Sequence, residues 1–211
     1  MNTTSVGPTS IVTGAQIVQA LSRARFGILS MAAIYFLSVA AGIAMVLNGN
    51  EFALAQRDNL VRRAQGSDPS LLALHQGNPL TAALWDFGEN LVLGAVPNTL
   101  AGVGIIVPYA GAAYRGWIGG IVSVNAAHAS RLADPAEAAY YLITLVLQLI
   151  PYSLAGGAGV NLGIAWLRPS AAYRGEKWLD VPKEALRDAA RIYILIVPLF
   201  LIASMWEFLA R

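Results

Sequence analysis

Two asparagines, a glutamate and a proline lie in or beside one apolar run, ENLVLGAVPNTLAGVGIIVP, which covers residues 89–108. Amides and carboxylates at membrane depth are costly, and they either mark a path for solutes and ions or join neighbouring helices. Glu89, Asn90, Pro97 and Asn98 are therefore the first candidates for chemistry. A proline here would also free a backbone carbonyl beside Asn98, which could bind a solute.

Polar and small residues recur at helical spacing in the later apolar runs. Asn90, Gly94, Asn98 and Gly102 follow one another at every fourth position, so one helix face would carry all four. The candidates for a polar path or a packing face are Glu89, Asn90, Asn98, Asn125, Glu137, Gln148, Tyr152 and Asn161. The predicted helix breaks are Pro97 and Pro151, and the predicted close-packing residues are Gly94, Gly102, Gly119, Ser123, Gly157 and Gly163.

This pattern has two interpretations. In a packed bundle, small residues let helix backbones approach closely and amides form hydrogen bonds across the contact. In a transport protein, helices broken at Pro97 and Pro151 would meet near the membrane midplane, and the amides would line a path. The packing interpretation is the simpler one, because it needs no ligand.

The two acids also have a structural alternative to ion binding. In DPAE, residues 134–137, Asp134 is a predicted helix N-cap with Pro135 at the first helical position and Glu137 at the third. DFGE, residues 86–89, repeats the spacing with Asp86 and Glu89. Capping would explain both acids, because a carboxylate at a helix N-terminus accepts hydrogen bonds from unpaired backbone N–H groups and is attracted by the positive end of the helix dipole.

The sequence carries no signature of a catalytic, metal or cofactor site. It has no HExxH, P-loop or GxSxG motif, no cysteine, and only His75 and His128 as histidines. A Ser–His–Asp arrangement is not selected by any motif. The formal net charge of +2 is small, and the basic residues cluster near predicted membrane ends, so nucleic acid is not an expected partner. We predict a non-enzymatic protein without cofactor or metal.

The elements that must position these residues are membrane-spanning helices. The 211 residues are 56% apolar and 12% charged, against about 25% charged residues in soluble domains. The mean hydropathy is +0.56, and several apolar runs approach or exceed the roughly 20 residues that cross a bilayer. The sequence therefore predicts an all-α polytopic transmembrane bundle of about five spans, with short interfacial amphipathic helices.

The chain divides into an N-terminal interfacial helix, residues 1–25, and one transmembrane domain, residues 26–211. The predicted spans are residues 26–48, 89–110, 116–130, 135–167 and 191–210, although 116–130 is short enough to be re-entrant. Surface helices are expected within residues 49–88, where Asp68 and Asn78 precede Pro69 and Pro79 as N-caps. The positive-inside rule places Arg23, Arg115 and the basic connection 168–190 in the cytoplasm, with the C-terminus outside.

The segments PNTLAGVGIIVPYAGAAYRGWIGGIVS, DPAEAAYYLITLVLQLIPYSLAGGAGVNLGIAW and ARIYILIVPLFLIASMWEFLA together resemble the bacterial stage II sporulation protein M family. The similarity runs from about Phe26 to the end of the chain. It implies a multi-pass protein of the bacterial cytoplasmic membrane that acts in a complex with other membrane proteins. In the family a histidine often stands shortly before the glutamate of the fourth helix, whereas His128 here precedes Glu137 by nine residues.

Two classes of function follow. The first is a membrane scaffold, whose surface helices and basic connection recruit partner proteins or anionic headgroups. The second is a channel or transporter for a small solute or ion. An intramembrane enzyme is a distant third. The expected partners are the lipid bilayer and other membrane proteins, and the glycine-lined faces would also suit a homodimer.

Overall fold

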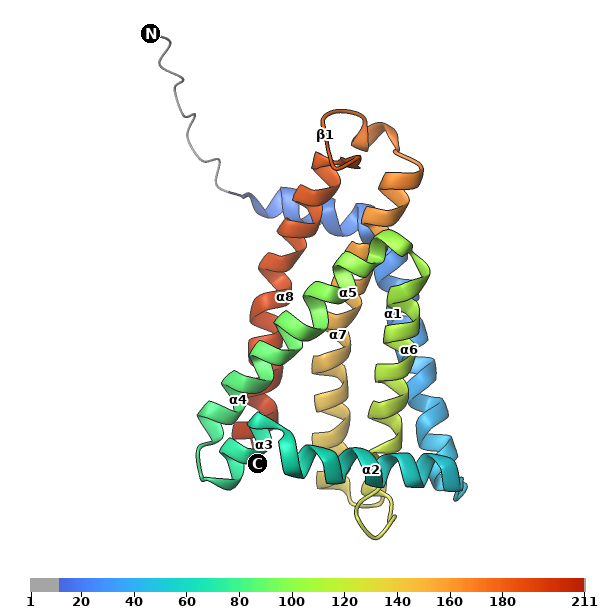
Figure 1. The fold of residues 1–211 in the computed structure, drawn as a ribbon, viewed down its shortest axis with the longest axis vertical. Coiled ribbons are helices and arrows are strands. Elements are labelled where there is room, and N and C mark those ends of the chain that lie inside the picture. Colours follow the sequence, from blue (N-terminus) through green and yellow to red (C-terminus); the bar gives the residue numbers. More distant parts are fainter. Residues whose placement is uncertain (1–11, 211) are drawn as a thin grey trace.

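The computed structural model describes residues 12–210, which form an all-α bundle with one short two-stranded hairpin (Figure 1). The expected helical fold class is confirmed. The elements are α1 (Gly14–Leu47), α2 (Glu51–Ser67), α3 (Pro69–His75), α4 (Pro79–Gly88), the π-helix η1 (Glu89–Ala95), α5 (Val96–Ala101), the 3₁₀ turn η2 (Gly102–Gly104), α6 (Ile106–Ile121), η3 (Arg131–Ala133), α7 (Pro135–Leu167), η4 (Ala171–Tyr173), β1 (Lys177–Trp178), β2 (Val181–Pro182) and α8 (Lys183–Leu209).

Three helices within the described residues, α1, α7 and α8, are long and apolar enough to cross a membrane. The expectation of a membrane protein is thus supported, whereas the count of about five spans is not confirmed. The helical run of residues 79–104 and the helix α6 also extend along the bundle (Figure 1). They fall short as single spans because the run changes from α to π to 3₁₀ geometry and α6 has only 16 residues.

The bundle has two distinct ends, which we call the hairpin end and the α2 end (Figure 1). The hairpin β1–β2 and the first part of α1 lie at the hairpin end. At the other end α2 runs across the bundle, roughly perpendicular to the long helices, as expected for a surface helix. Asp68 accepts hydrogen bonds from the first N–H groups of α3, and Pro69 and Pro79 begin their helices as predicted.

The predicted boundaries around residues 89–130 are wrong. The helix there begins at Pro79, reverses at residues 102–105 and returns as α6, which ends at Ile121 instead of Ser130. The reversal uses Gly102 and Gly104 and a positive φ of 52° at Ile105, a conformation that a β-branched residue rarely adopts. Arg115 consequently lies inside α6, and its predicted place in a cytoplasmic connection is wrong.

Neither proline breaks its helix in the predicted way. Pro151 lies buried within α7, which continues without a break from Pro135 to Leu167. Pro97 stands in the first turn of α5, directly after the π-helix η1, where the Val96 N–H bonds to Leu91 O five residues back. The π turn supplies the extra residue that lets the run continue past a residue without an N–H.

Two further boundaries differ from the sequence prediction. The helix α1 is continuous from Gly14 to Leu47, so no break separates an interfacial helix from a first span at residue 25. Residues 1–11 of that predicted interfacial helix lie outside the described residues. The helix α8 begins at Lys183, eight residues before the predicted start, because residues 183–190 form its first turns instead of a connection.

Contacts between glycines hold the middle of the bundle together. A Cβ atom at Gly102 would come within 2.1 Å of the Gly159 backbone, and one at Gly157 within 2.5 Å of Ile28. Nearer the C-terminal end of α1, a Cβ at Gly42 would come within 2.6 Å of the Trp117 backbone. Such close approach between backbones is the packing mode that small residues permit in lipid.

Candidate solute cavity between the helices

A cavity of about 540 Å³ opens between the helices on the α2 side of the bundle. We call it the Arg115 cavity. It is lined by Tyr35, Leu60, Asp86, Asn90, Gly111, Tyr114, Arg115, Ile118, Gly119, Val122, Arg131, Tyr140, Tyr141, Thr144, Leu145, Gln148, Tyr152 and Glu207. A volume of this size suits a small molecule, since small-molecule sites span roughly 300–1,000 Å³.

One face of α7 supplies a row of polar side chains to the cavity. Tyr141, Thr144, Gln148 and Tyr152 follow one another at intervals of three or four residues, which is the spacing of a single helix face. At 1.5 Å per residue, Tyr152 lies about 16 Å deeper along the helix than Tyr141. Leu60 of α2 and Arg131 at the start of η3 mark the cavity's wall near the α2 end.

Arg115 is the cation in the interior of this cavity. Its Nη1 donates a hydrogen bond of 2.8 Å to the Tyr152 hydroxyl, and its guanidinium carbon lies 4.4 Å from the centre of the same ring. Within residues 12–210, no carboxylate lies within 4.0 Å of it as an ion-pair partner. A charged side chain without a counter-ion at membrane depth is expensive to retain, and such residues commonly serve binding or transport.

The Tyr152 hydroxyl connects Arg115 to the π-helix η1. It donates a hydrogen bond of 2.5 Å to Asn90 Oδ1, and a Cβ at Gly94 would come within 2.6 Å of its oxygen. Gly94 is therefore required for the tyrosine to reach Asn90. Asp86, one helical turn before Asn90, accepts a 2.6 Å hydrogen bond from the Ser204 hydroxyl of α8.

A second polar contact joins α7 to α8 along the same cavity. Gln148 Nε2 lies 3.4 Å from Glu207 Oε2, and the Tyr140 hydroxyl donates to the Glu207 backbone carbonyl at 2.6 Å. Gln148 Oε1 is buried and has no hydrogen-bond partner among the described residues. Because buried acceptors are almost always paired, this oxygen is suited to a ligand or a water molecule.

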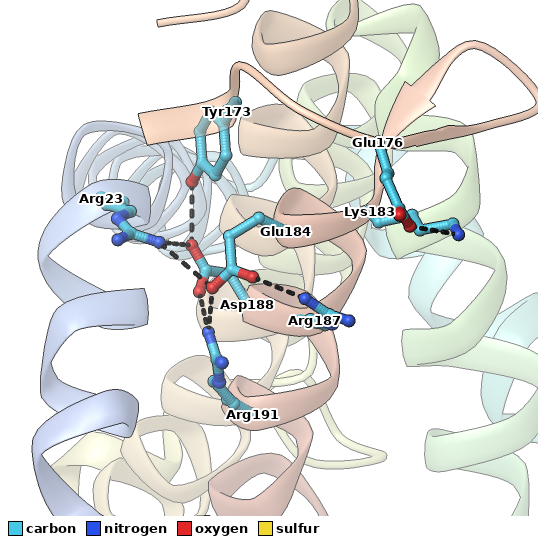
Figure 2. Close-up of polar contacts among 8 residues, drawn as sticks. All are labelled: Arg23, Tyr173, Glu176, Lys183, Glu184, Arg187, Asp188 and Arg191. Carbon is cyan, nitrogen blue, oxygen red and sulfur yellow. Dashed lines mark hydrogen bonds and ion pairs between the residues drawn. The ribbon is translucent and has the colours of Figure 1, made fainter. Parts of the chain in front are cut away.

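The hairpin end contains a cluster of charged residues in which, unlike at Arg115, each charge has partners of the opposite sign (Figure 2). Asp188 of α8 is fully buried, and it accepts hydrogen bonds from Arg23 at 2.9 Å and from Arg191 at 2.8 Å. The Tyr173 hydroxyl donates to the same carboxylate at 3.0 Å and accepts from Asn161 Nδ2 at 2.8 Å. Burial raises the pKa of Tyr173 to about 12, so its hydroxyl keeps its proton for this bond.

The predicted polar residues divide between the cavity and other roles. Asn90, Gln148 and Tyr152 line the cavity together. Asn98 lies between Gly111 of α6 and Gly156 of α7, and Asn161 bonds to Tyr173 at the hairpin end. Asn125 accepts hydrogen bonds from the Ala127 and Ala129 N–H groups in the loop after α6.

The two predicted acids lie away from the centre of the cavity. The Asp134 side chain caps α7 as predicted, and the Glu137 side chain lies 3.9 Å from Arg131 in an exposed ion pair. The predicted cap at Asp86 and Glu89 is wrong, because both residues lie within the continuous run of residues 79–104. Glu89 is half-buried at the start of η1 and does not line the cavity.

The predicted small residues lie at helix contacts. A Cβ at Gly163 would come within 2.3 Å of the Gly102 backbone carbonyl, and one at Gly119 within 2.9 Å of Leu145. Ser123 is fully buried. Of the predicted set, Gly94 and Gly119 border polar groups of the cavity: Gly94 packs against Tyr152 and Arg115, and the Gly119 carbonyl accepts a hydrogen bond from the Tyr141 hydroxyl.

The sequence prediction missed Arg115, Asp86 and Glu207 as parts of one site. A usable signal was present for Arg115, because it is the one charged residue between Glu89 and Arg131 in a run rich in glycine and apolar residues. Asp86 and Glu207 meet the cavity through the packing of α4 and α8, which no local pattern specifies. No group of acids and histidines suited to a metal ion occurs in residues 12–210.

Comparison of the chain with protein-family models, with curated proteins and with solved structures finds no match. The chemistry of the cavity is therefore inferred from its lining side chains alone. Two arginines, two carboxyl groups, two amides and several tyrosine hydroxyls surround a space of small-molecule size. This arrangement can bind a small polar molecule.

Proposed function

We propose that the chain is a multi-pass membrane protein that binds a small polar solute in the Arg115 cavity and passes it across the bilayer. The observation that carries the proposal is Arg115 itself. It lies in the interior of α6, faces a cavity, and has a tyrosine in place of a counter-ion. A charged residue with only a structural role would be expected to carry a neutralising partner, as the buried Asp188 does.

In this proposal the residue run 79–104 and α6 cross the membrane together with α1, α7 and α8. A π turn and a short helix at membrane depth are tolerated where they are surrounded by protein or line a cavity. Lys and Arg are concentrated in residues 168–191 and beside the start of the apolar part of α1, which makes the hairpin end cytoplasmic by the positive-inside rule. The cavity then opens toward the outside of a bacterial cytoplasmic membrane.

The cavity is closed toward the cytoplasm. Every residue from Pro151 to Gly163 of α7 is buried, and the glycine contacts with α1 and η2 fill this half of the bundle. An outward-open cavity above a packed half is one of the states that alternating access requires. Passage of a solute would need these packed contacts to separate.

The membrane scaffold implied by the resemblance to stage II sporulation protein M is the second candidate. Its support is the extent of glycine packing, which accounts for most of the predicted small residues without any solute. Neither candidate requires catalysis, and a homodimer remains a prediction for both.

Solute flux tests the proposal directly. Purified protein in liposomes is mixed with iso-osmotic solutions of urea, glycine betaine and 4-aminobutyrate, and swelling is followed by light scattering. At least one solute should enter faster than into protein-free liposomes, and Arg115→Leu and Gln148→Leu should slow its entry. Arg25→Gln, at an exposed position outside the cavity, is the matched control and should leave entry unchanged.

The scaffold candidate predicts a different result. Entry at the protein-free rate for every solute, with correctly folded protein, would contradict transport. Solute entry through Arg115→Leu and Gln148→Leu at the rate of the unchanged chain would also contradict transport through the Arg115 cavity.

A further inference from the structure

We propose that a groove on the outer face of α8, at the hairpin end, binds an anionic phospholipid through its phosphate and one acyl chain. The groove has a volume of about 660 Å³. It is lined by Val12, Gln16, Arg187, Ala190, Arg191 and Ile194, and we call it the α8 groove. The proposal does not depend on the solute cavity, because it needs only that the hairpin end lies at a membrane surface.

The α8 groove lies where a phospholipid headgroup would meet the chain. The first turns of α1 run across the bundle at the hairpin end, and one side of the groove is formed there by Val12 and Gln16 (Figure 1). The first turns of α8 form the other side, and the apolar part of α8 follows from Ile192 onward. A helical segment that lies across the ends of spanning helices is typical of the boundary between headgroups and acyl chains.

One face of α8 carries first a charge and then an apolar surface. Arg187, Ala190, Ile194 and Val197 follow one another at intervals of three or four residues, and all four are exposed on the outside of the bundle. At 1.5 Å per residue, Val197 lies about 15 Å along the helix from Arg187, which is half of the roughly 30 Å hydrocarbon core. This order matches a phospholipid, in which the acyl chains follow the phosphate.

The groove contains two arginines and, among the described residues, no carboxylate. The Arg187 side chain is 66% exposed and donates one hydrogen bond within residues 12–210, of 3.3 Å to Glu184, so most of its five N–H donors remain accessible. Arg191 contacts Glu184 and Asp188, which Arg23 also contacts. Three arginines thus share two carboxylates, and one positive charge is left over. A guanidinium fork can bind phosphate oxygens in a bidentate contact.

The excess of positive charge extends over the whole hairpin end. Residues 12–25 and 168–191 contain eight Lys and Arg residues against four acids, whereas residues 48–89 and 122–137, at the α2 end, contain four against seven. Each basic residue near an anionic lipid surface strengthens the attraction about fivefold. The charge therefore favours an anionic lipid over a zwitterionic one, and the apolar continuation of the groove favours a lipid over a free phosphate.

Native mass spectrometry of the full chain tests the lipid class. The protein in detergent is titrated with phosphatidylglycerol and, separately, with phosphatidylcholine that carries the same acyl chains. Phosphatidylglycerol should be retained about fivefold or more tightly than phosphatidylcholine. Glycerophosphoglycerol, which is the same headgroup without acyl chains, should not displace the bound lipid at equal concentration. Displacement at equal concentration would indicate a site for small anions and would overturn the phospholipid.

Two variants locate the site. Arg187→Gln should weaken retention of phosphatidylglycerol about fivefold and leave that of phosphatidylcholine unchanged. Its control is Arg25→Gln, at another exposed arginine of the same end that does not line the groove, and it should leave retention unchanged. Ala190→Phe fills the groove without a change of charge and should weaken retention of phosphatidylglycerol at least as much as Arg187→Gln. Its control is Ala41→Phe, at an exposed alanine of α1 outside the groove.

Three results would overturn the proposal. The first is equal retention of the two lipids by the unchanged chain. The second is an equal loss in Arg187→Gln and Arg25→Gln, which would mean that the basic end attracts anionic lipid without a defined site. The third is a loss in Arg187→Gln with none in Ala190→Phe, which would place the lipid outside the groove. Thermal unfolding of each variant shows that it is folded.

Discussion

The two halves of the bundle treat buried charge in opposite ways. Near the hairpin end, Asp188 is fully buried between Arg23 and Arg191, and it also accepts a hydrogen bond from the Tyr173 hydroxyl (Figure 2). Toward the α2 end, Arg115 faces an open cavity with a tyrosine as its partner. We call these the closed half and the open half. Under the proposed function, the closed half serves stability and the open half serves binding.

The same division appears along α7. From Pro151 to Gly163 every residue is buried, and glycines bring its backbone against Ile28 and Gly102. From Tyr141 to Tyr152 one face of the helix carries polar side chains into the cavity. A single 33-residue helix thus joins a dry contact to a polar wall.

The largest expected effect is at Asp188. Asp188→Asn removes the buried carboxylate that Arg23 and Arg191 share and leaves them only the partly exposed Glu184, so the free energy of unfolding should fall by about 3 kcal/mol. The value lies at the low end for a broken buried pair because the side chains of Arg23 and Arg191 are 21% and 14% exposed. Unfolding in detergent, followed by tryptophan fluorescence, measures it. The exposed pair of Glu176 and Lys183 provides the control, since Glu176→Gln should change little.

A methyl group at Gly102 tests the packing of the closed half. The new Cβ would lie 2.1 Å from the Gly159 backbone, which cannot move aside as a side chain can, so Gly102→Ala should destabilise the fold by about 1–3 kcal/mol. Gly88→Ala is the matched control, because Gly88 is also helical and its Cβ meets nothing within 4 Å. That variant should be neutral or more stable by up to about 1 kcal/mol. Equal losses in both would argue against close packing at Gly102.

Replacing Arg115 should have little effect on stability, in contrast to Asp188. Arg115→Gln removes an ion that has no carboxylate partner within the described residues, and it loses one hydrogen bond to Tyr152. We expect the free energy of unfolding to change by less than about 1 kcal/mol. A loss as large as that of Asp188→Asn would mean that Arg115 is part of the structural framework, and the division into two halves would fail.

The smallest effect concerns the surface of the open half. Asp58 of α2 accepts hydrogen bonds from Arg57 at 2.9 Å and contacts His128 of the loop after α6 at 3.0 Å. The hydrogen bond from Arg57, aided by His128, holds the pKa of Asp58 below its ordinary value. A lowered folded-state pKa stabilises the fold above the unfolded pKa, and this contribution is lost as the pH falls through the folded pKa.

Hydrogen exchange of residues 122–131 measures this pH dependence. Exchange should quicken, after correction for its intrinsic pH dependence, as the pH falls below the ordinary pKa of an aspartate. Asp58→Asn should remove that dependence and leave the exchange of α7 unchanged. A similar dependence in the variant would mean that another group controls the loop.

Local sequence patterns predicted the helical fold and several of its details. The runs of apolar residues identified α1, α7 and α8, and the Asp–Pro pairs identified the starts of α3 and α7. The glycine positions at helix contacts were named from their spacing, since close approach in lipid requires small side chains. These features depend on neighbours a few residues apart.

Features that depend on distant residues were predicted less well. Pro97 and Pro151 were predicted to break their helices. Instead, Pro97 follows a π turn that lets the helical run continue, and Pro151 lies inside the continuous helix α7. Arg115 was predicted to lie at the end of a span, because nothing in the sequence indicated that the chain reverses earlier, at residues 102–105. That reversal uses a positive φ at Ile105, which its residue type does not suggest. Asn90, Gln148 and Tyr152 were named for the polar path, while their charged neighbours from α4, α6 and α8 were not.

The central claim is that the cavity is open to water from one side and that the closed half is dry. The chain has no cysteine, so single-cysteine variants can be labelled without background. In membrane vesicles, Thr144→Cys should react with a small membrane-impermeant thiol reagent supplied from the α2 side and not from the hairpin side. Ser153→Cys, buried in the closed half, should react from neither side. Labelling of Ser153→Cys as fast as Thr144→Cys, or no labelling of Thr144→Cys from either side, would contradict the account.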